Sequence, residues 1–317
     1  MAIDTLLLTG FGGPTKGTCI KHGADCPSEA RCFVSGIFGD NPARQVRVDE
    51  VVKHYEALGG YSKFNEITEA QADAIKSELS KRGHELNIYV GYDHWAPHIA
   101  DKVKELADAG SKEFLTLVMS PHQSSLSWDG YLRRVTEGLD ALEGDKPEWA
   151  GVAEPWWNKA GFIDSIAEHI LIAADKVGAD VKSFETGLLL SAHAVPESLI
   201  KTSPYTKQIA ETAELVANKL GAANWMVSYQ SGPSDSTIPW TSPILENALP
   251  QLVEKGAKKI IGTPIGFLCD NVEVLYDLGV EGQEEADKAG VEYVSAEAVN
   301  LNPKFISLLA DQVEAKL

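Results

Sequence analysis

Short apolar runs alternate along the chain with longer stretches in which apolar residues recur at helical intervals. Each run has the length of a buried strand, and each longer stretch has the period of a helix that packs one face against a core. The predicted strands are 5–9, 85–90, 114–120, 149–153, 187–191, 225–229, 259–263 and 292–295. The predicted helices are 66–82, 99–109, 128–142, 159–177, 207–220, 244–254, 272–289 and 303–317. This alternation is typical of βαβ units and predicts an α/β protein with parallel sheets.

The two halves of the chain resemble each other. Residues 6–11 read LLLTGF and residues 188–193 read LLLSAH, and each segment ends a predicted strand. Glycine, proline and charged residues come together at 143–147, which marks a boundary between domains. We therefore expect a duplicated architecture with a ligand cleft between two similar domains. The expected domains are 1–145 and 146–302, with the last helix (303–317) packing back on the first.

Charge and composition exclude some classes of binding partner and some cellular locations. The 317 residues carry a formal net charge of −18, which argues against a nucleic-acid partner because few cations are available to contact phosphates. The first residues run directly into a predicted strand without a basic leader, and no apolar stretch approaches the roughly 20 residues that cross a bilayer. We expect a cytoplasmic protein with no transmembrane segment.

A histidine and a glutamate follow two of the predicted strands in the second half. His193 comes directly after 187–191, and Glu273 comes after 259–263 and a short turn. Open α/β sheets bind ligands at the carboxyl ends of their strands, so both side chains are expected at such a site. An imidazole and a carboxylate that meet there can take protons from a substrate or hold a divalent cation.

Two further carboxylates follow Glu273 at intervals of four residues, Asp277 and Glu281. If 272–289 is helical, this spacing places all three acids along one face. A row of acids on a helix is also typical of an ordinary solvated face. We interpret the three acids as a path for metal ions only because His193 is expected at the same site.

Aromatic residues follow other strand ends. Phe11 lies in the segment Gly10–Pro14 (GFGGP), whose glycines allow a tight turn and close approach of a ligand. Pro14 removes a backbone N–H that a phosphate would need, so the segment is not a dinucleotide-binding loop. Trp240 stands in a Pro/Gly-rich loop and offers an aromatic wall for a planar ligand or a buried anchor for the loop itself.

The chain has four cysteines, of which three crowd into a polar segment that has the composition of a loop. Such a group with a distant fourth thiol can bind an iron–sulfur cluster or zinc. Three free thiols are the simpler interpretation. The candidate ligands are Cys19, Cys26, Cys32 and Cys269.

These segments together resemble the ferrochelatases, which insert ferrous iron into a porphyrin in haem biosynthesis. The resemblance extends from Leu6 to about Phe305, and the order and spacing of its motifs carry it. The motifs are LTGFGGP (8–14), HYEALGG (54–60), SAH (191–193) with Pro196, YQSGP (229–233) with Pro239 and Trp240, and PIGF (264–267) with Asp270 and EVLY (273–276).

The resemblance implies two Rossmann-like chelatase domains with the porphyrin in the intervening cleft. It makes His193 and Glu273 the catalytic pair and extends the metal site through Asp277 and Glu281. Phe11 takes the place of an aromatic residue or methionine over the centre of the macrocycle, and its ring cannot ligate the metal. Residues at 271 and 202–205 and the segment 15–32 depart from the family pattern.

The expected ligands are the porphyrin and ferrous iron, and the propionates of the porphyrin need cationic or hydroxyl partners. The candidates for porphyrin contact are Phe11, Arg44, Arg47, Ser124 and Trp240. Some members of the family hold a [2Fe–2S] cluster on four cysteines, but their C-terminal cysteine triad is absent here, so the cluster is not favoured. Transient contact with other enzymes of haem synthesis is a further expectation.

Three questions stay open at this point. The substrate is either protoporphyrin IX or coproporphyrin III, with the GFGGP turn and the segment 120–122 favouring the latter. The alternatives to a ferrochelatase are a non-catalytic tetrapyrrole or metal carrier and a chelatase for another tetrapyrrole. Imidazole and carboxylate ligands do not by themselves select iron over zinc or cobalt.

Overall fold

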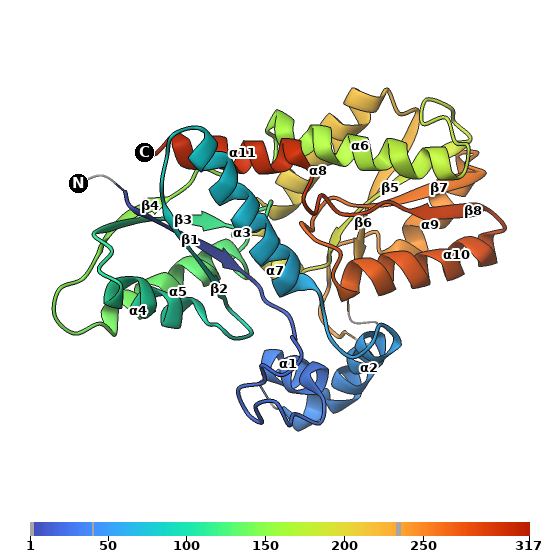
Figure 1. Ribbon diagram of the computed structural model, residues 1–317. Coiled ribbons are helices and arrows are strands. Elements are labelled where there is room, and N and C mark those ends of the chain that lie inside the picture. The colour runs from blue at the N-terminus through green and yellow to red at the C-terminus, as the bar shows by residue number, and fades with distance from the viewer. Residues whose placement is uncertain (1–2, 40, 233–235) are drawn as a thin grey trace. The chain divides into compact units, whose positions relative to one another are not determined.

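The structure, a computed structural model, describes residues 3–39, 41–232 and 236–317. These residues form two four-stranded parallel sheets flanked by helices, which confirms the predicted fold class (Figure 1). The last residue of the YQSGP motif, Pro233, lies outside the described residues. Every predicted strand is present. The bounds are β1 (Thr5–Gly10), β2 (Asn87–Tyr92), β3 (Glu113–Val118), β4 (Glu148–Val152), β5 (Thr186–His193), β6 (Asn224–Gln230), β7 (Lys259–Pro264) and β8 (Glu292–Ser295).

The two sheets have the same topology. The strand order is β2-β1-β3-β4 in the first and β6-β5-β7-β8 in the second, with every neighbouring pair parallel. The sequence similarity between 6–11 and 188–193 therefore falls on the equivalent strands β1 and β5. The carboxyl ends of these central strands carry Phe11 and His193.

The chain divides into two compact units. Unit 1 comprises Met1–Ser120, Ser125–Glu154 and Leu309–Leu317, and unit 2 comprises Pro121–Ser124 and Pro155–Leu308. The division falls beyond the expected boundary at residue 145 because β4 pairs with β3 and belongs to the first sheet. Within unit 1, the end of the last helix is held by ion pairs from Arg82 to Asp311 and Glu314.

Helices cover both faces of each sheet. In unit 1, α4 (Ile99–Asp108) and α5 (Trp128–Asp140) pack on one face, and α3 (Phe64–Lys81) crosses the other (Figure 1). In unit 2, α6 (Ala160–Lys176) and α8 (Tyr205–Leu220) pack together, and α9 (Leu245–Glu254) packs with α10 (Gly282–Ala289). The chain also contains α7 (Glu197–Ile200) and α11 (Pro303–Glu314).

Among the described residues, two helices longer than a single turn lie where the sequence analysis expected none. α1 (Glu29–Ile37) begins in the polar segment that was expected to be a loop, and α2 (Gln45–Ala57) follows a short 3₁₀ turn, η1 (Pro42–Arg44). The Ser28 side chain caps α1 by accepting a hydrogen bond from the Arg31 backbone N–H. Phe33 and Val34 bury the inner face of α1, so Cys32 lies on a helix rather than in a loop.

The helix that begins at Glu273 is a π-helix, η2 (Glu273–Glu281), which continues into α10. Tyr293 on β8 holds this helix, because its hydroxyl donates a hydrogen bond to the Leu278 carbonyl oxygen at 2.6 Å. The Tyr293 ring fits only because Gly262 and Gly282 lack side chains. A Cβ atom at either glycine would lie 2.0 or 2.4 Å from the Tyr293 oxygen.

Gly262→Ala is therefore expected to lower the free energy of unfolding by about 1–3 kcal/mol, the range for overpacking a well-filled core. The added methyl group would displace the Tyr293 hydroxyl from the Leu278 carbonyl. Chemical denaturation monitored by circular dichroism measures the change. Gly36→Ala on α1 is the control, because a Cβ atom there meets nothing within 4 Å. Equal stability of the wild-type protein and the Gly262→Ala variant would contradict the packing argument.

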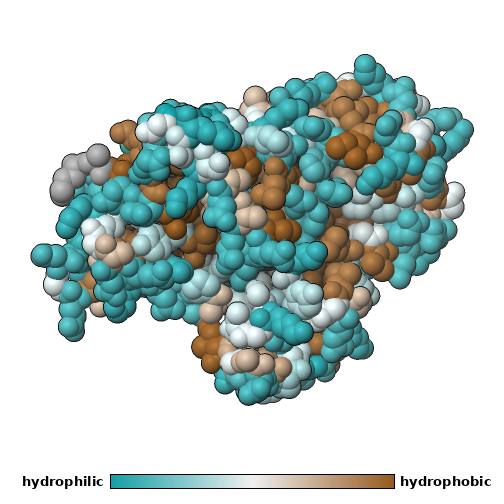
Figure 2. Space-filling model, viewed as in Figure 1, coloured by the Kyte–Doolittle hydropathy of each residue, from teal (hydrophilic) through white to brown (hydrophobic). Residues whose placement is uncertain are grey.

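The surface is mostly polar on the face shown in Figure 2, where hydrophobic side chains form separate small patches. Such a surface agrees with the excess of acidic residues in the composition. Among the residues that the structure describes, no helix combines the length and the apolar character that crossing a membrane requires.

Candidate active site in the second unit

The candidate site lies at the carboxyl edge of the sheet in unit 2. β5 ends at His193, the neighbouring β6 ends at Gln230, and β7 ends at Pro264 on the other side of β5. Because the strands are parallel, these ends share one edge, where α/β sheets bind ligands. The loop after β7 leads from this edge into η2 and brings Glu273 to His193.

His193 and Glu273 meet directly. The distance between His193 Nε2 and Glu273 Oε1 is 3.5 Å, and the side chains are 38% and 34% exposed. On the other side of the ring, His193 Nδ1 lies 2.5 Å from the Ala194 carbonyl oxygen, to which it donates a hydrogen bond. This bond directs Nε2 toward Glu273 and leaves the pair partly open to solvent and to a ligand.

The surroundings hold a proton on His193. Burial by itself lowers the pKa of the imidazole, but the charge of Glu273 and its hydrogen bond outweigh burial. The Ala194 carbonyl and the charge of Asp277 act in the same direction, and together they raise the pKa of His193 to about 9. At neutral pH the imidazole of His193 therefore carries a proton next to the Glu273 side chain.

Buried polar side chains fix the backbone on both sides of the pair. The Ser191 hydroxyl donates to Gln230 Oε1 at 2.6 Å, and Gln230 Nε2 donates to the Glu273 carbonyl oxygen at 2.7 Å. The Tyr205 hydroxyl donates to the His193 carbonyl oxygen at 3.0 Å. One glutamine thus links the strand that carries the histidine to the helix that carries the glutamate.

A close backbone approach brings the loop after β7 against β5. The backbone N–H groups of Ile265 and Gly266 both donate to the Ser191 carbonyl oxygen. A Cβ atom at Gly266 would lie 2.8 Å from Ala192 Cβ, so only glycine allows this contact. The glycine of the PIGF motif therefore has a structural reason that the sequence alone did not give.

The three acids of the row differ in their surroundings. Asp277 is buried and accepts a hydrogen bond from the Ser231 hydroxyl, whereas Glu273 and Glu281 are half-buried. Ser231 has a left-handed backbone conformation, with φ of 64°, at the end of β6. The prediction that 272–289 is helical is confirmed, with a π-helix in its first part, where four residues still make close to one turn.

Asp270 has a structural task. Its carboxylate accepts hydrogen bonds from the Ala298 backbone N–H at 2.8 Å and from Asn300 Nδ2 at 2.7 Å. Both oxygens are thus used to hold the loop between β7 and η2. Asn271 contributes to the same turn, because its Oδ1 accepts a hydrogen bond from the Val274 backbone N–H at 3.0 Å.

Trp240 lies on a loop that runs beside the segment after His193. Trp240 and Pro196 form an antiparallel bridge, and the Thr241 backbone N–H donates to the Val195 carbonyl oxygen. The indole Nε1 donates to the Ser236 hydroxyl at 2.8 Å. The loop is therefore anchored through its backbone next to the candidate site, and the indole ring is half-exposed.

The other candidates for porphyrin contact have varied surroundings. Ser124 is buried within unit 2. In unit 1, Phe11 is half-buried at the end of β1, with its ring centroid 4.4 Å from that of His94. Arg44 is exposed above the Phe38 ring, and Arg47 forms an ion pair with Glu50 at 2.8 Å. Their role in binding stays a prediction.

Four residues around these sites had no role in the sequence analysis. They are Tyr205, Gln230, Ser231 and His94. Gln230 and Ser231 stood within a recognised motif, and a weak signal existed for His94, which follows a strand end. Tyr205 had appeared only as the last residue of the run 202–205, which departs from the family pattern.

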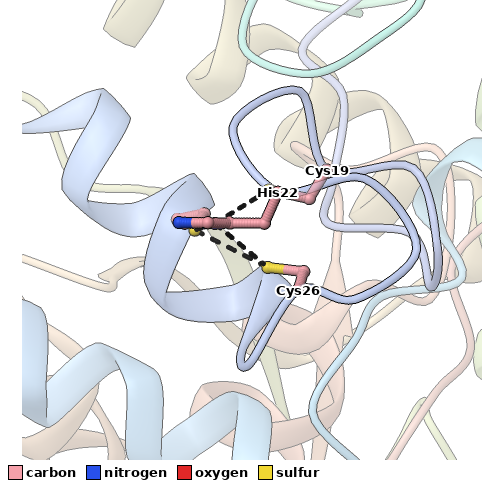
Figure 3. Close-up of side chains that lie close together, drawn as sticks. Cys19, His22 and Cys26 are labelled. Carbon is pink, nitrogen blue, oxygen red and sulfur yellow. Dashed lines mark hydrogen bonds between the residues drawn. The ribbon is translucent and has the colours of Figure 1, made fainter.

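Cys19, Cys26 and Cys32 come together, and the fourth member of their group is His22 rather than Cys269. The ligand atoms of the four residues all lie within 4.8 Å of one another, and Cys19, His22 and Cys26 point toward one another from one loop (Figure 3). Cys269 belongs to unit 2, where it is 2% exposed and burial raises the pKa of its thiol.

The fold resembles that of chelatases of known structure. SirB from Bacillus subtilis, solved with Fe³⁺, has a TM-score of 0.60 to this chain at 9% identity, covering 99% of this chain and 96% of SirB. CbiX, the terminal enzyme of sirohaem biosynthesis in denitrifying bacteria, has a TM-score of 0.55 at 15% identity, covering 99% of both chains. At these identities the likeness shows the fold alone.

Comparison of sequences gives the family. The ferrochelatase family model matches residues 31–317. A ferrochelatase of Deinococcus radiodurans is 34% identical over 98% of this chain and 95% of its own length. A coproporphyrin III ferrochelatase of Oceanobacillus iheyensis is 31% identical over 98% of this chain and 96% of its own length. The chain therefore belongs to the ferrochelatase family.

Proposed function

We propose that this protein inserts ferrous iron into a porphyrin in haem biosynthesis and that its porphyrin is coproporphyrin III. The observation that carries the proposal is the pair of His193 and Glu273, 3.5 Å apart at the carboxyl edge of a chelatase sheet. Membership of the ferrochelatase family supports iron and a porphyrin as substrates. Relatives named coproporphyrin III ferrochelatase, at about 30% identity over nearly the whole chain, support the choice of porphyrin.

Metallation exchanges two pyrrole protons for one ferrous ion, so the site must accept protons and tolerate a divalent cation. Iron(II) that approaches Glu273 repels the proton on His193 Nε2, because both compete for the same carboxylate. The imidazole that has released its proton to solvent can then accept the two pyrrole protons one after the other, passing the first on to solvent, or hold the iron before insertion. Glu273 balances the charge of whichever cation is present.

The acids beyond Glu273 provide a path to solvent. Asp277 follows one turn along η2 and is buried, and its negative charge already adds to the field at His193. Glu281, at the end of η2, is half-buried. We assign the row of three acids to passage of iron toward His193 or of protons away from it.

The porphyrin itself needs apolar walls and partners for its propionates. We assign the walls to the half-exposed rings of Phe11 and Trp240. Arg44, Arg47 and Ser124 are proposed to bind propionates, and Arg44 is the most exposed of the three. A macrocycle bent by contact with such rings exposes its nitrogen lone pairs and N–H bonds to a proton acceptor, the role proposed for His193.

Comparative turnover tests this proposal. Anaerobically purified protein is given ferrous iron with either coproporphyrin III or protoporphyrin IX, and the metallated product is followed by its absorbance. We expect multiple turnovers, faster with coproporphyrin III. Multiple turnovers with protoporphyrin IX alone would overturn the choice of porphyrin. A change in the porphyrin spectrum without turnover would identify a carrier and overturn the enzymatic proposal.

A further inference from the structure

A second group of metal-binding side chains lies in unit 1, in the segment that connects β1 to α1. His22 Nδ1 is 3.7 Å from the sulfur of Cys19, 3.7 Å from that of Cys26 and 3.3 Å from that of Cys32. The sulfurs of Cys26 and Cys32 are 3.7 Å apart. One imidazole nitrogen therefore lies at nearly equal distances from three sulfurs. Figure 3 shows His22 with two of these cysteines, Cys19 and Cys26.

These distances are those of a single tetrahedral site. With zinc–sulfur bonds of about 2.3 Å and zinc–nitrogen bonds of about 2.0–2.1 Å, the edges of a tetrahedron are about 3.8 Å between sulfurs and about 3.6 Å between sulfur and nitrogen. The four separations given above lie close to these values, and all the ligand atoms lie within 4.8 Å of one another. The donor set of three thiols and one imidazole is common among structural zinc sites.

The same geometry does not suit a [2Fe–2S] cluster. Each iron of such a cluster binds two protein ligands, and the two pairs are held apart by both irons and the bridging sulfides. Ligands of different irons then lie farther apart than the edge of one tetrahedron. Here a single nitrogen is within 3.7 Å of all three sulfurs, which leaves room for one ion at the centre.

We propose that Cys19, His22, Cys26 and Cys32 bind one zinc ion in a mononuclear structural site. Binding requires the three thiols to lose their protons to solvent, so that three thiolates and a neutral imidazole surround the ion. This inference does not depend on the proposed function. Three of the four ligands precede residue 31, where the match to the ferrochelatase family begins.

The segment around the site explains what the ion would stabilise. From Lys16 to Asp25 the chain is exposed except at Cys19, so it buries almost no apolar surface of its own. A metal can supply the stability that such a segment lacks. Cys32 stands in the first turns of α1, and the ion would therefore tie the loop directly to that helix.

α1 in turn contacts Phe11, one of the residues proposed to form a wall for the porphyrin. Phe33, next to Cys32, packs edge-to-face against Phe11 with centroids 6.2 Å apart and against Trp95 at 5.9 Å. The Trp95 indole donates to the Thr18 hydroxyl at 2.8 Å, which joins the loop to the same cluster. The zinc site would thus position α1 and Phe33 behind Phe11.

Metal content of the full chain, purified anaerobically without added metal, tests the proposal. We expect one zinc per chain by elemental analysis, and the charge-transfer and d–d bands of a tetrahedral thiolate site after replacement with cobalt. Cys32→Ser and His22→Ala should lose most of the bound metal. Cys269→Ser is the matched control and should keep it, as should His193→Ala, which separates this ion from substrate metal.

Proteolysis gives a readout that does not involve activity. Removal of zinc with a chelator should increase the rate of tryptic cleavage at Lys16 and Lys21 by about tenfold or more, because a segment that loses its structural metal unfolds locally more often. Two irons per chain with the spectrum of a [2Fe–2S] cluster would overturn the mononuclear site. Protein that binds neither zinc nor cobalt stoichiometrically, or that keeps its zinc when Cys32 is serine, would overturn the proposal as well.

Discussion

His193→Ala is expected to slow iron insertion by about 10²–10⁴-fold, the range for removing a general base, while the porphyrin still binds. The ring stands at the end of β5, and its Nε2 is the nitrogen directed at Glu273. Removing it takes away the group proposed to receive pyrrole protons or hold iron, but none of the proposed walls. Steady-state turnover and porphyrin binding measured by fluorescence quenching separate the two effects.

His169→Ala serves as the control, since His169 is a half-buried histidine on α6, away from the carboxyl edge of the sheet. This variant should keep wild-type turnover. A His193→Ala variant that turns over at a near-normal rate would end the assignment of His193. Loss of porphyrin binding in the same variant would instead make His193 a porphyrin contact rather than a base.

The strands of both sheets could be predicted from the sequence because central parallel strands are covered on both faces. Leu6, Leu7 and Leu8, and equally Leu188, Leu189 and Leu190, are fully buried and form continuous apolar runs. α1 and α2 could not be predicted in the same way. Both carry many exposed polar residues, and each buries only a few side chains, such as Phe33 on α1 and Val52 on α2.

The candidate site could be predicted only in part. His193 and Glu273 follow strands, and strand ends can be found from the apolar pattern. Gln230 could not be assigned its task, because its link to the Glu273 carbonyl depends on the loop that returns from β7. His22 was missed for a related reason. A histidine in an exposed polar loop has no pattern that marks it, and only the fold of 19–32 brings it to three sulfurs.

Glu273→Gln is expected to lower the pKa of His193 below its wild-type value of about 9 and to reduce iron insertion by roughly 10²-fold or more. The carboxylate is the main group that holds the proton on the imidazole, and burial, which opposes that proton, remains in the variant. In the wild-type protein, kcat/KM for iron should rise with pH as His193 loses its proton. In the variant this rise should move to lower pH, with a lower maximum because the carboxylate ligand is lost.

The same change has a signature in stability that a merely structural role would not give. A raised pKa means that the proton favours the folded state, so this stabilisation is complete below about pH 6.5 and is lost as pH rises through about 9. Water screens the effect, because the imidazole is 38% exposed. The stability difference between the wild-type protein and Glu273→Gln should therefore be larger near pH 6 than above pH 9.

Glu284→Gln is the control for this prediction. Glu284 lies on the exposed face of α10, so the variant removes the same charge and should show no such pH dependence. An unchanged imidazole pKa in Glu273→Gln, measured by NMR titration, would show that another group holds the proton on His193.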